Sequence, residues 1–536
     1  MLTYDMDQRG EESLYAYLYD CMRADIENGS IAAGEKLPSK RKLADHLGVS
    51  IVTVEGAYRQ LIAEGYVESR ARRGYFAAHI SSSNTRALTK EGGVAPAGTF
   101  MPDAFEHKGE NELVFSPSYA FDLSKGQLPE SLFPLASWSK SLRDTLTQEP
   151  ASALVGESDP LGCMALREEI SRYLRQTRGL VAPPESIVVG SGAQTLYNLI
   201  VQLIGRNRTV GVEDPGYPRL RRVYGANNVR LSPIPLDASG VSMASVRAAG
   251  VDTLHITPSH QFPTGIVTSV SRRHELLGWA TEVPGRYIIE DDYDCEFRLA
   301  GRPIPAMKSI DAVDRVVYVN TFARSLGPSF RIAYAVLPAH LAERFRSALG
   351  FYSCTVSTME QLVLARFIEH GDFERHVNRM RSHYRAVKGA LVEALAASPA
   401  GDRMTVEGAD AGLHFLLRVA SPASEERLVA AARQEGVALA PLSAFRLGGE
   451  AGGGKASDEA AGKADGNVMA GSAGGLGAET DGALGPDGAR GRAVETSSES
   501  DAVRSFVVSY GGLPLASVAE TAAALARAVE AAERAC

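Results

Sequence analysis

From about residue 117 to the end of the chain, short apolar strands alternate with helical segments. The run Ile187–Val189 is one such strand, and it leads through a Gly-containing turn into a helix. The apolar residues of that helix fall on one face: Leu196, Leu199, Ile200 and Leu203. This alternation predicts an α/β domain built around a mostly parallel sheet.

The rest of the chain divides by composition. At 536 residues it is too long for a single compact core. Residues 1–78 are dense in short helical patterns, 79–116 form a Ser-, Gly- and Pro-rich linker, and 117–536 form the α/β domain. Residues 448–500 contain almost no large apolar side chains, so we predict a disordered insertion in a surface loop. An interaction segment is the alternative for that stretch.

Several classes of protein are disfavoured. No apolar run approaches the ~20 residues that cross a bilayer, and the acidic N-terminus lacks the features of a signal peptide. We therefore expect a cytoplasmic protein with no membrane partner. The five cysteines are scattered and form no CxxC pair, which argues against a disulfide framework and against a metal site.

Charge is distributed unevenly. The net charge of −8 does not by itself suggest nucleic acid as a partner. Residues 36–75, however, hold eight Lys or Arg against four acids. A basic module inside an acidic chain predicts local binding to a polyanion.

Residues 14–77 show the pattern of a winged helix-turn-helix. A first amphipathic helix carries Leu14, Leu18 and Met22 on one face, and a second begins after the N-cap Ser39. Ser50 caps a third helix. Two short runs, 66–69 and 74–77, then bracket a basic tip and predict a β-hairpin wing.

This arrangement predicts binding to double-stranded DNA. The start of the third helix can enter the major groove, while arginines on the second helix, the third helix and the wing contact phosphates. A three-helix protein-binding module with a solvated basic face is the alternative. The predicted DNA-binding residues are Ser39, Arg41, Ser50, Thr53, Arg59, Arg70, Arg72 and Arg73.

The same residues resemble the GntR-type winged helix. The resemblance is carried by Leu37-Pro38-Ser39-Lys40-Arg41-Lys42-Leu43-Ala44, Leu47-Gly48-Val49-Ser50, Ala57-Tyr58-Arg59-Gln60-Leu61 and Glu64-Gly65-Tyr66.

Beyond the linker, the chain resembles fold-type I aminotransferases as they occur fused to GntR-type heads in MocR/GabR-type regulators. The motifs that carry the resemblance are Asp159-Pro160-Leu161-Gly162, Gly190-Ser191-Gly192-Ala193-Gln194, Glu213-Asp214-Pro215-Gly216-Tyr217-Pro218-Arg219, Thr257-Pro258-Ser259-His260-Gln261-Phe262-Pro263-Thr264-Gly265, Tyr287-Ile288-Ile289-Glu290-Asp291-Asp292-Tyr293-Asp294 and the run from Tyr318 to Arg331.

The resemblance implies a site for pyridoxal 5'-phosphate. The segment around Gly192 and Ala193 would hold the phosphate together with Arg331, although a Gly-rich turn alone could be a plain turn. Tyr217 would stack on the ring, and Asp291, with Asp292 as the alternative, would pair with the ring nitrogen. The predicted ligand-binding residues are Gly192, Ala193, Tyr217, Arg219, Asp291, Tyr293, Arg324 and Arg331.

One position departs decisively from the pattern. Arg324 stands where the family has the lysine that forms the Schiff base with the cofactor. A guanidinium remains protonated and is not nucleophilic near neutral pH, so it cannot form that bond. The nearest lysine in sequence, Lys308, precedes the strand and is not expected to reach the site. Any cofactor would therefore be held non-covalently, and no catalytic residue is predicted.

Other substitutions agree with this reading. Ala323 replaces a serine beside the lysine position, and Phe262 stands where the aminotransferases have an asparagine. Glu157 occupies the position of a tyrosine that binds phosphate from the partner subunit, where a carboxylate is unfavourable. Val507 lies where many aminotransferases place the arginine that binds the substrate carboxylate.

The leading hypothesis is a homodimeric transcription regulator whose aminotransferase-like domain senses an effector. The effector would be pyridoxal phosphate or another small anionic metabolite bound near Arg324 and Arg331. One alternative is an active aminotransferase with a DNA-binding appendage. Another is a structural dimeriser that only spaces two DNA readers.

Overall fold

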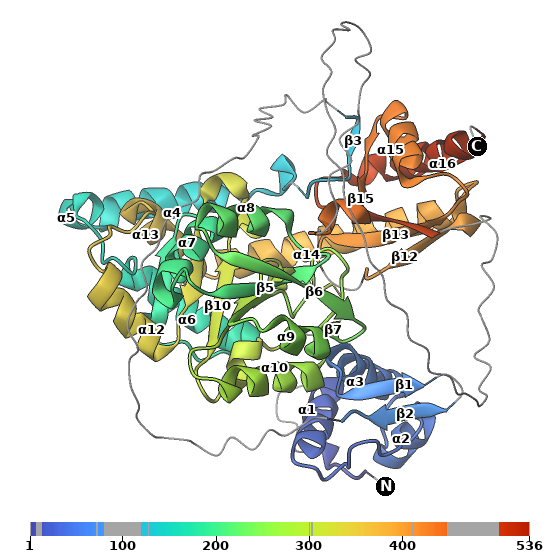
Figure 1. Cartoon of the computed structure of the whole chain (residues 1–536), viewed down its shortest axis with the longest axis horizontal. Helices are drawn as coiled ribbons and strands as arrows, with labels where there is room; N and C mark the ends of the chain where they lie inside the picture. The colour runs from blue at the N-terminus through green and yellow to red at the C-terminus, as the bar shows by residue number, and fades with distance from the viewer. Residues whose placement is uncertain are drawn as a thin grey trace, which may run out of the picture.

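The computed structural model describes residues 2–6, 13–70, 73–79, 119–126, 128–299, 301, 304–409, 412–447 and 503–534. The predicted linker after residue 79, the wing residue Arg72 and the predicted 448–500 insertion lie outside these residues. Figure 1 shows a small N-terminal domain, residues 13–79, which we call the head, beside a large domain that begins at residue 119.

The head is a winged helix-turn-helix. It contains α1 (Leu14–Glu27), α2 (Lys40–Leu47), α3 (Ile51–Glu64) and the hairpin of β1 (Val67–Arg70) and β2 (Gly74–Ala77). Ser39 accepts a hydrogen bond from the Lys42 amide at 3.3 Å, and Ser50 accepts one from the Thr53 amide at 3.1 Å. Both predicted N-caps are therefore confirmed. The helices pack around a buried apolar core: Leu18, Met22, Leu43, Val54, Tyr58 and Leu61.

An eight-stranded sheet organises the large domain. Its order is β4 (Ile187–Gly190), β11 (Ala333–Val336), β10 (Val316–Thr321), β9 (Tyr287–Asp291), β8 (Thr253–Ile256), β5 (Thr209–Asp214), β6 (Arg230–Asp237) and β7 (Gly240–Val241). The pairs β10–β9, β9–β8, β8–β5 and β5–β6 are parallel, which confirms the predicted sheet type.

Helices cover both faces of this sheet because alternate strand residues point to opposite sides. On β9, Ile289 packs into one apolar cluster and Ile288 into another. The first face is covered by α7 (Ala193–Ile204), α8 (Pro218–Ala226) and α12 (Ala339–Arg344). The other face is covered by α6 (Met164–Arg178), α9 (Met243–Ala249), α10 (Val270–Glu282) and α13 (Thr358–Glu369). Further helices α4 (Leu135–Gln148) and α5 (Ala151–Val155) contact α13.

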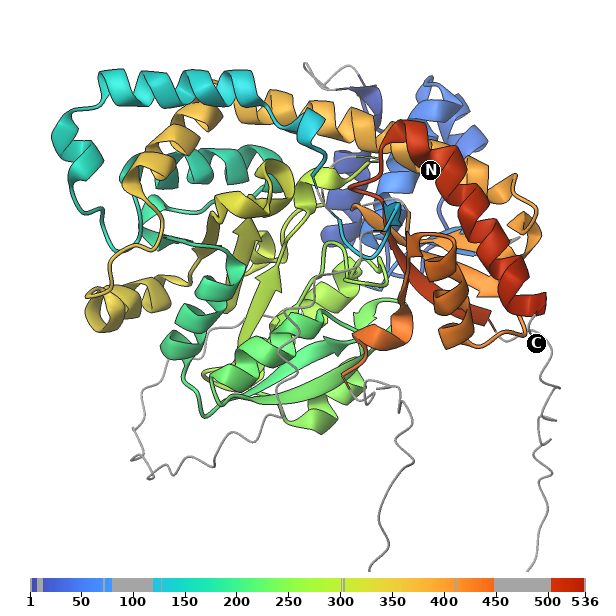
Figure 2. The ribbon, with the colours of Figure 1, turned by 90° about the horizontal axis from the view of Figure 1, so that it is seen from above.

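A smaller antiparallel sheet forms the C-terminal part. Its order is β12 (Met404–Glu407), β13 (His414–Ala420), β16 (Val503–Ser509) and β15 (Ala440–Pro441). It packs with α14 (Asp372–Ala396), α15 (Glu425–Gln434) and α16 (Val518–Arg534), as Figure 2 shows. The start of the large domain returns to this part, because β3 (Phe121–Asp122) pairs with β14 (Val437–Ala438). Within the described residues, no helix combines the length and the apolar character that a membrane crossing requires.

Candidate functional site

The first turn of α3 is the exposed end of the predicted DNA-reading helix. Ile51 is 43% exposed and Val52 is 75% exposed. The hydroxyl groups of Ser50 and Thr53 lie 2.8 Å apart, so these two side chains cap the helix and bond to each other. Their polar atoms also face solvent at this turn, and a helix N-terminus offers free N–H groups to phosphate.

The head carries several exposed basic side chains. Arg41 on α2, Arg59 on α3 and Arg73 in the wing are exposed. Arg70 is partly neutralised, since it lies 2.9 Å from Glu68 and stacks over the ring of Phe76. The structure thus places the predicted arginines on exposed parts of the head, and their contacts with DNA stay a prediction.

Lys40 was not among the predicted DNA-binding residues. Its ammonium group lies 2.7 Å from Glu55 on α3 and faces the ring of Tyr75 in the wing. This side chain therefore connects α2, α3 and the wing. The basic run 40–42 in the sequence contained the signal, but the sequence could not distinguish an internal ion pair from a phosphate contact.

The predicted phosphate-binding residues meet at the start of α7, which we call the predicted anion-binding corner. Gly192 has a φ of +88°, and a Cβ there would lie 2.6 Å from a guanidinium nitrogen of Arg331. Arg331 donates a hydrogen bond to the Ser191 carbonyl at 3.3 Å. Ala193 is the first residue of α7, so helix N–H groups and a cation meet at one place. Only glycine allows the arginine this close approach.

Asp291 lies at the carboxyl end of β9, as predicted, and is buried. Its Oδ2 atom accepts a hydrogen bond from Tyr197 on α7 at 2.5 Å and lies 3.5 Å from Nε2 of His255. Burial and the charge of Asp291 raise the pKa of Tyr197 well above its usual value. Because Tyr197 belongs to the helix that begins at Ala193, α7 links Asp291 to the predicted anion-binding corner.

The adjacent carboxylate has a different role. Asp292 forms a buried ion pair with Arg178 at 2.6 Å and accepts a hydrogen bond from Tyr318 at 2.7 Å. Arg178 also donates to the Ser259 hydroxyl. Asp292 therefore has a buried cationic partner within the fold, which favours Asp291 over Asp292 as the ligand residue.

Arg324 follows the carboxyl end of β10, on α11 (Ala323–Leu326). It donates a hydrogen bond to the Gly126 carbonyl at 3.2 Å, and its guanidinium carbon lies 5.7 Å from the centre of the Tyr293 ring. Lys308 lies at the opposite end of β10, where its ammonium group donates to the Val316 carbonyl at 2.7 Å. This placement agrees with the prediction that Lys308 does not reach the site.

Aromatic rings fill the space beside Arg324. The ring of Phe262 has its centre 6.0 Å from that of Tyr217 and 6.2 Å from that of Tyr293. His414 and Phe445 complete the cluster at 5.1 Å and 5.3 Å. The structure therefore brings Tyr217, Tyr293 and Arg324 together. Sequence reasoning missed His414 and Phe445, because neither lies in a recognisable motif.

Arg219, in contrast, is exposed on the first turn of α8, and no contact connects it with this cluster among the described residues. Glu157 is exposed and accepts a hydrogen bond from Ser353. Val507 is buried in β16, where it pairs with Leu416 and Ala440. The expected roles of these positions stay predictions.

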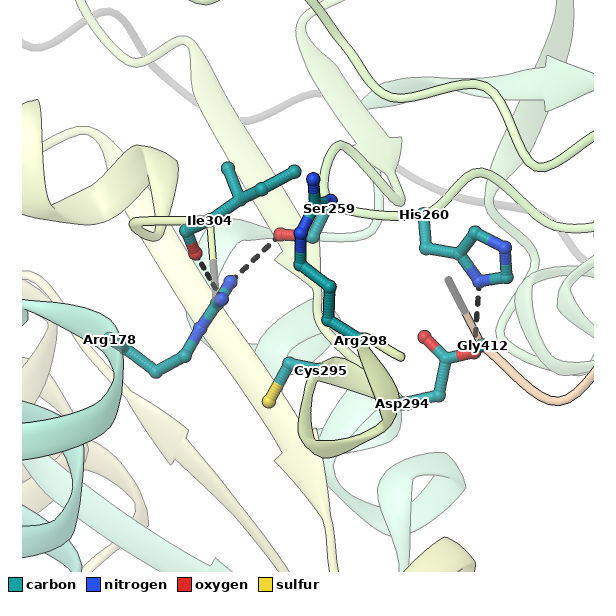
Figure 3. Close-up of a pocket in the computed structure, with 8 residues that line it drawn as sticks. All are labelled: Arg178, Ser259, His260, Asp294, Cys295, Arg298, Ile304 and Gly412. Carbon is teal, nitrogen blue, oxygen red and sulfur yellow. Dashed lines mark hydrogen bonds and ion pairs between the residues drawn. The ribbon is translucent and has the colours of Figure 1, made fainter. Parts of the chain in front are cut away.

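A small cavity lies next to the aromatic cluster (Figure 3). It is lined by Arg178, Ser259, His260, Asp294, Cys295, Arg298, Ile304 and Gly412. Nδ1 of His260 lies 2.9 Å from Oδ2 of Asp294 and 3.2 Å from the Tyr293 hydroxyl. Ligand atoms of His260, Asp294 and His414 all lie within 4.8 Å of one another.

This cluster contains a histidine–carboxylate pair. Its carboxylate bonds directly to His260. Burial, with smaller contributions from His260 and Arg324, lowers the pKa of His414 well below its usual value.

Comparisons with known proteins identify a family and individual proteins that this chain resembles. Residues 14–76 match the model of the bacterial regulatory proteins of the gntR family. The chain is 38% identical to the uncharacterized HTH-type transcriptional regulator YhdI of Bacillus subtilis, over 82% of this chain and 91% of that protein. It is 32% identical to the probable rhizopine catabolism regulatory protein MocR of Rhizobium meliloti, over 83% of this chain and 89% of that protein.

Among solved structures, the large domain is similar to kynurenine aminotransferase of Pyrococcus horikoshii, described in complex with PMP. The TM-score is 0.59 at 20% sequence identity, over 78% of this chain and 92% of that one. At this identity the likeness shows the fold, which is that of the aminotransferases.

Proposed function

Because this chain belongs to the MocR-type family of HTH-type transcriptional regulators, we propose that its large domain senses a small anionic ligand for the DNA-binding head and does not transaminate. The observation that carries the proposal is Arg324 at the carboxyl end of β10. A protonated guanidinium binds anions but does not act as a nucleophile near neutral pH.

The residues of the site fit pyridoxal 5'-phosphate as a non-covalent ligand. Gly192, Ala193 and Arg331 would hold a phosphate, because the arginine lies against the glycine at the helix start. Tyr217 offers a ring face, and Asp291 offers a buried carboxylate at the end of β9. When bound, the cofactor supplies a phosphate dianion and an electron-withdrawing pyridine ring.

The residues near Arg324 can bind a ligand, but they lack the lysine that transamination requires. Arg324 can hold a carboxylate or phosphate oxygen, while Phe262 and Tyr293 exclude water beside it. Without a lysine there, this chain offers no amine at the position where the family places one. Another small anionic metabolite with a flat ring would satisfy the same residues.

The test combines binding with covalent labelling. Added pyridoxal phosphate should raise the melting temperature of the full chain, because a ligand of the native state stabilises it by mass action. Borohydride treatment followed by peptide mass spectrometry should leave Arg324 unmodified. An adduct on a lysine of the pocket, or transfer of an amino group to a keto acid, would favour the active aminotransferase instead.

A homodimer is part of the proposal. Val155 is 85% exposed and Phe351 is 75% exposed. The hydrogen bond between Ser353 and Glu157 places these two apolar side chains on neighbouring segments. An apolar patch of this kind supports contact with a second copy, and a two-fold dimer would present two heads to a palindromic operator. Sedimentation velocity should give a dimer for the native chain and a monomer for Phe351→Glu.

We propose that the head binds DNA. This partner also implies the cellular compartment in which the protein acts. A protein that acts on chromosomal DNA works in the bacterial cytoplasm. The exposed arginines Arg41, Arg59 and Arg73 support phosphate contacts, and the first turn of α3 supports contact with base edges.

A further inference from the structure

The end of α3 opposite its exposed reading turn is pressed against the large domain. A Cβ on Gly65 would lie 2.6 Å from the side chain of Ser269, which caps α10. Val270, the first residue of α10, packs into the apolar core of the head. Ser271 donates a hydrogen bond to the His79 carbonyl. Figure 1 shows α10 and the head side by side.

A buried carboxylate lies at this contact. Glu64, the last residue of α3, is 4% exposed and accepts hydrogen bonds from Tyr19 at 2.6 Å and from Gln60. Burial raises its pKa, while the charges of Arg273 and Arg298 in the large domain act in the opposite direction. The side-chain oxygen of Gln60 lies against Gly301, which has no side chain to displace it.

The cations facing Glu64 are connected to the ligand pocket through two loops. Arg273 donates to the carbonyl of Pro258 at 3.0 Å and to that of Thr268 at 3.1 Å. Pro258 belongs to the loop after β8, which continues to His260 and Phe262. Arg273 and residues 257–261 of the loop are buried, so movement of one displaces the other.

The second connection runs through the loop after β9. This loop starts at Asp291, passes Tyr293 and the 3-10 turn Cys295–Phe297, and reaches Arg298. Arg298 lines the cavity together with His260 and Asp294, as Figure 3 shows. Each loop therefore has one end in the ligand pocket and the other beside the end of α3.

We propose that Glu64, assisted by Gln60, is the positioning residue through which occupancy of the ligand pocket sets the orientation of α3. This inference rests on the proposed function, and it names the contacts through which the ligand would regulate DNA binding. α3 has 14 residues. At 1.5 Å per residue such a helix is about 21 Å long, so a small rotation at Glu64 displaces Ser50 at the reading end. In a dimer, that displacement changes the spacing of the two reading helices.

Hydrogen exchange of the full chain, followed by mass spectrometry, tests this proposal. The pocket is perturbed in two ways, by added pyridoxal phosphate and by Arg324→Ala. Either perturbation should change exchange in residues 51–66 by about threefold, the scale of a coupling of somewhat under 1 kcal/mol. Glu64→Ala should abolish that response while the response at residues 190–197 persists. Glu35→Gln, at an exposed carboxylate of the head that faces solvent, should keep both responses.

If Glu64→Ala unfolds the head, as faster exchange across 14–27 would reveal, Gln60→Ala replaces it, because that change removes the contact with Gly301 and leaves the bond from Tyr19 to Glu64. An unchanged 51–66 response in the variant would overturn the role of Glu64. If exchange in the native chain changes at residues 190–197 but not at 51–66, the role of Glu64 is also overturned, while the proposal that the ligand binds stands. If pyridoxal phosphate fails to alter residues 190–197, the ligand is wrong, and the Arg324→Ala arm still decides the role of Glu64.

Discussion

Two corners of the proposed ligand site differ in the groups they carry. At the start of α7, Arg331 lies against Gly192 in an arrangement that suits the proposed anion. At the end of β10, Arg324 stands beside the aromatic cluster around Phe262. Under the proposed function the first corner binds the ligand and the second does not support transamination, because binding and reaction depend on separable groups.

The largest expected effect comes from Arg324→Lys, which tests whether the two corners act independently. A lysine there supplies the missing amine, so bound pyridoxal phosphate should become covalently attached after borohydride treatment, in contrast to the native chain. Intact-mass spectrometry measures the change. Transamination should stay undetectable, because Phe262 and Val507 are unchanged. Turnover by this single variant would show that the two corners are less independent than we infer.

Substitution of Glu213 tests how the corner around Phe262 contributes to the stability of the fold. Its buried carboxylate accepts hydrogen bonds from Thr257 at 2.5 Å and from Gln261 at 3.3 Å, and burial raises its pKa to about 7. Between pH 4.5 and 7 the folded state holds a proton that the unfolded state releases, so this group's contribution to stability is lost as the pH rises. The loss is about 3 kcal/mol above pH 7.

Glu213→Gln should remove this contribution to the pH dependence. Unfolding with denaturant at pH 5 and at pH 8 gives the unfolding free energy of the variant and of the native chain. From pH 5 to pH 8, the stability of the variant relative to the native chain should increase by up to about 3 kcal/mol. Glu290 and Glu296 have pKa values raised to about 7 for the same reason and cancel in the difference. An equal difference at both pH values would contradict the raised pKa.

Arg331→Ala examines the intact corner. Loss of a charged donor beside the helix start should weaken binding of pyridoxal phosphate by about 2 kcal/mol, or about 30-fold. Isothermal titration measures the affinity. Arg344→Ala, at an exposed arginine on α12, is the matched control and should have no effect. Equal affinities for native chain and Arg331→Ala would remove this corner from the binding site.

The smallest expected effect concerns the head. Arg73→Ala removes one exposed wing cation, so affinity for duplex DNA should fall modestly and uniformly across sequences. The slope of log affinity against log salt should decrease by about one. Fluorescence anisotropy at several salt concentrations measures both, again with Arg344→Ala as control. An unchanged slope would place Arg73 away from the phosphates.

The head could be predicted in detail because its signals are local. Ser39 and Ser50 cap helices within three residues of their partners, and Gly48 and Gly65 adopt the left-handed conformation that ends α2 and α3. The mostly parallel sheet of the large domain followed from alternating strands and helices for the same reason. Such features need only the neighbouring sequence.

The site could be predicted only in part. The motifs predicted roles for Asp291, Tyr217 and Arg324, and these roles stay predictions. Whether Asp291 or Asp292 is available depends on Arg178, more than a hundred residues away. His414 and Phe445 reach Phe262 from the C-terminal part of the chain, where no motif marks them. Glu64 is indistinguishable from a solvated helix end in the sequence, and it is buried at the end of α3, where α10 packs against the head.

The antiparallel pairing of β15 with β16 has a practical consequence. Pro441 pairs with Phe506 across these adjacent strands, and Leu447 donates a hydrogen bond to Asp214 at the carboxyl end of β5. The stretch 448–502 thus links, along the sequence, two strands that are already neighbours. Replacing it with a fluorescent protein should leave the pairing intact and give the chain an optical signal for the effector that we propose.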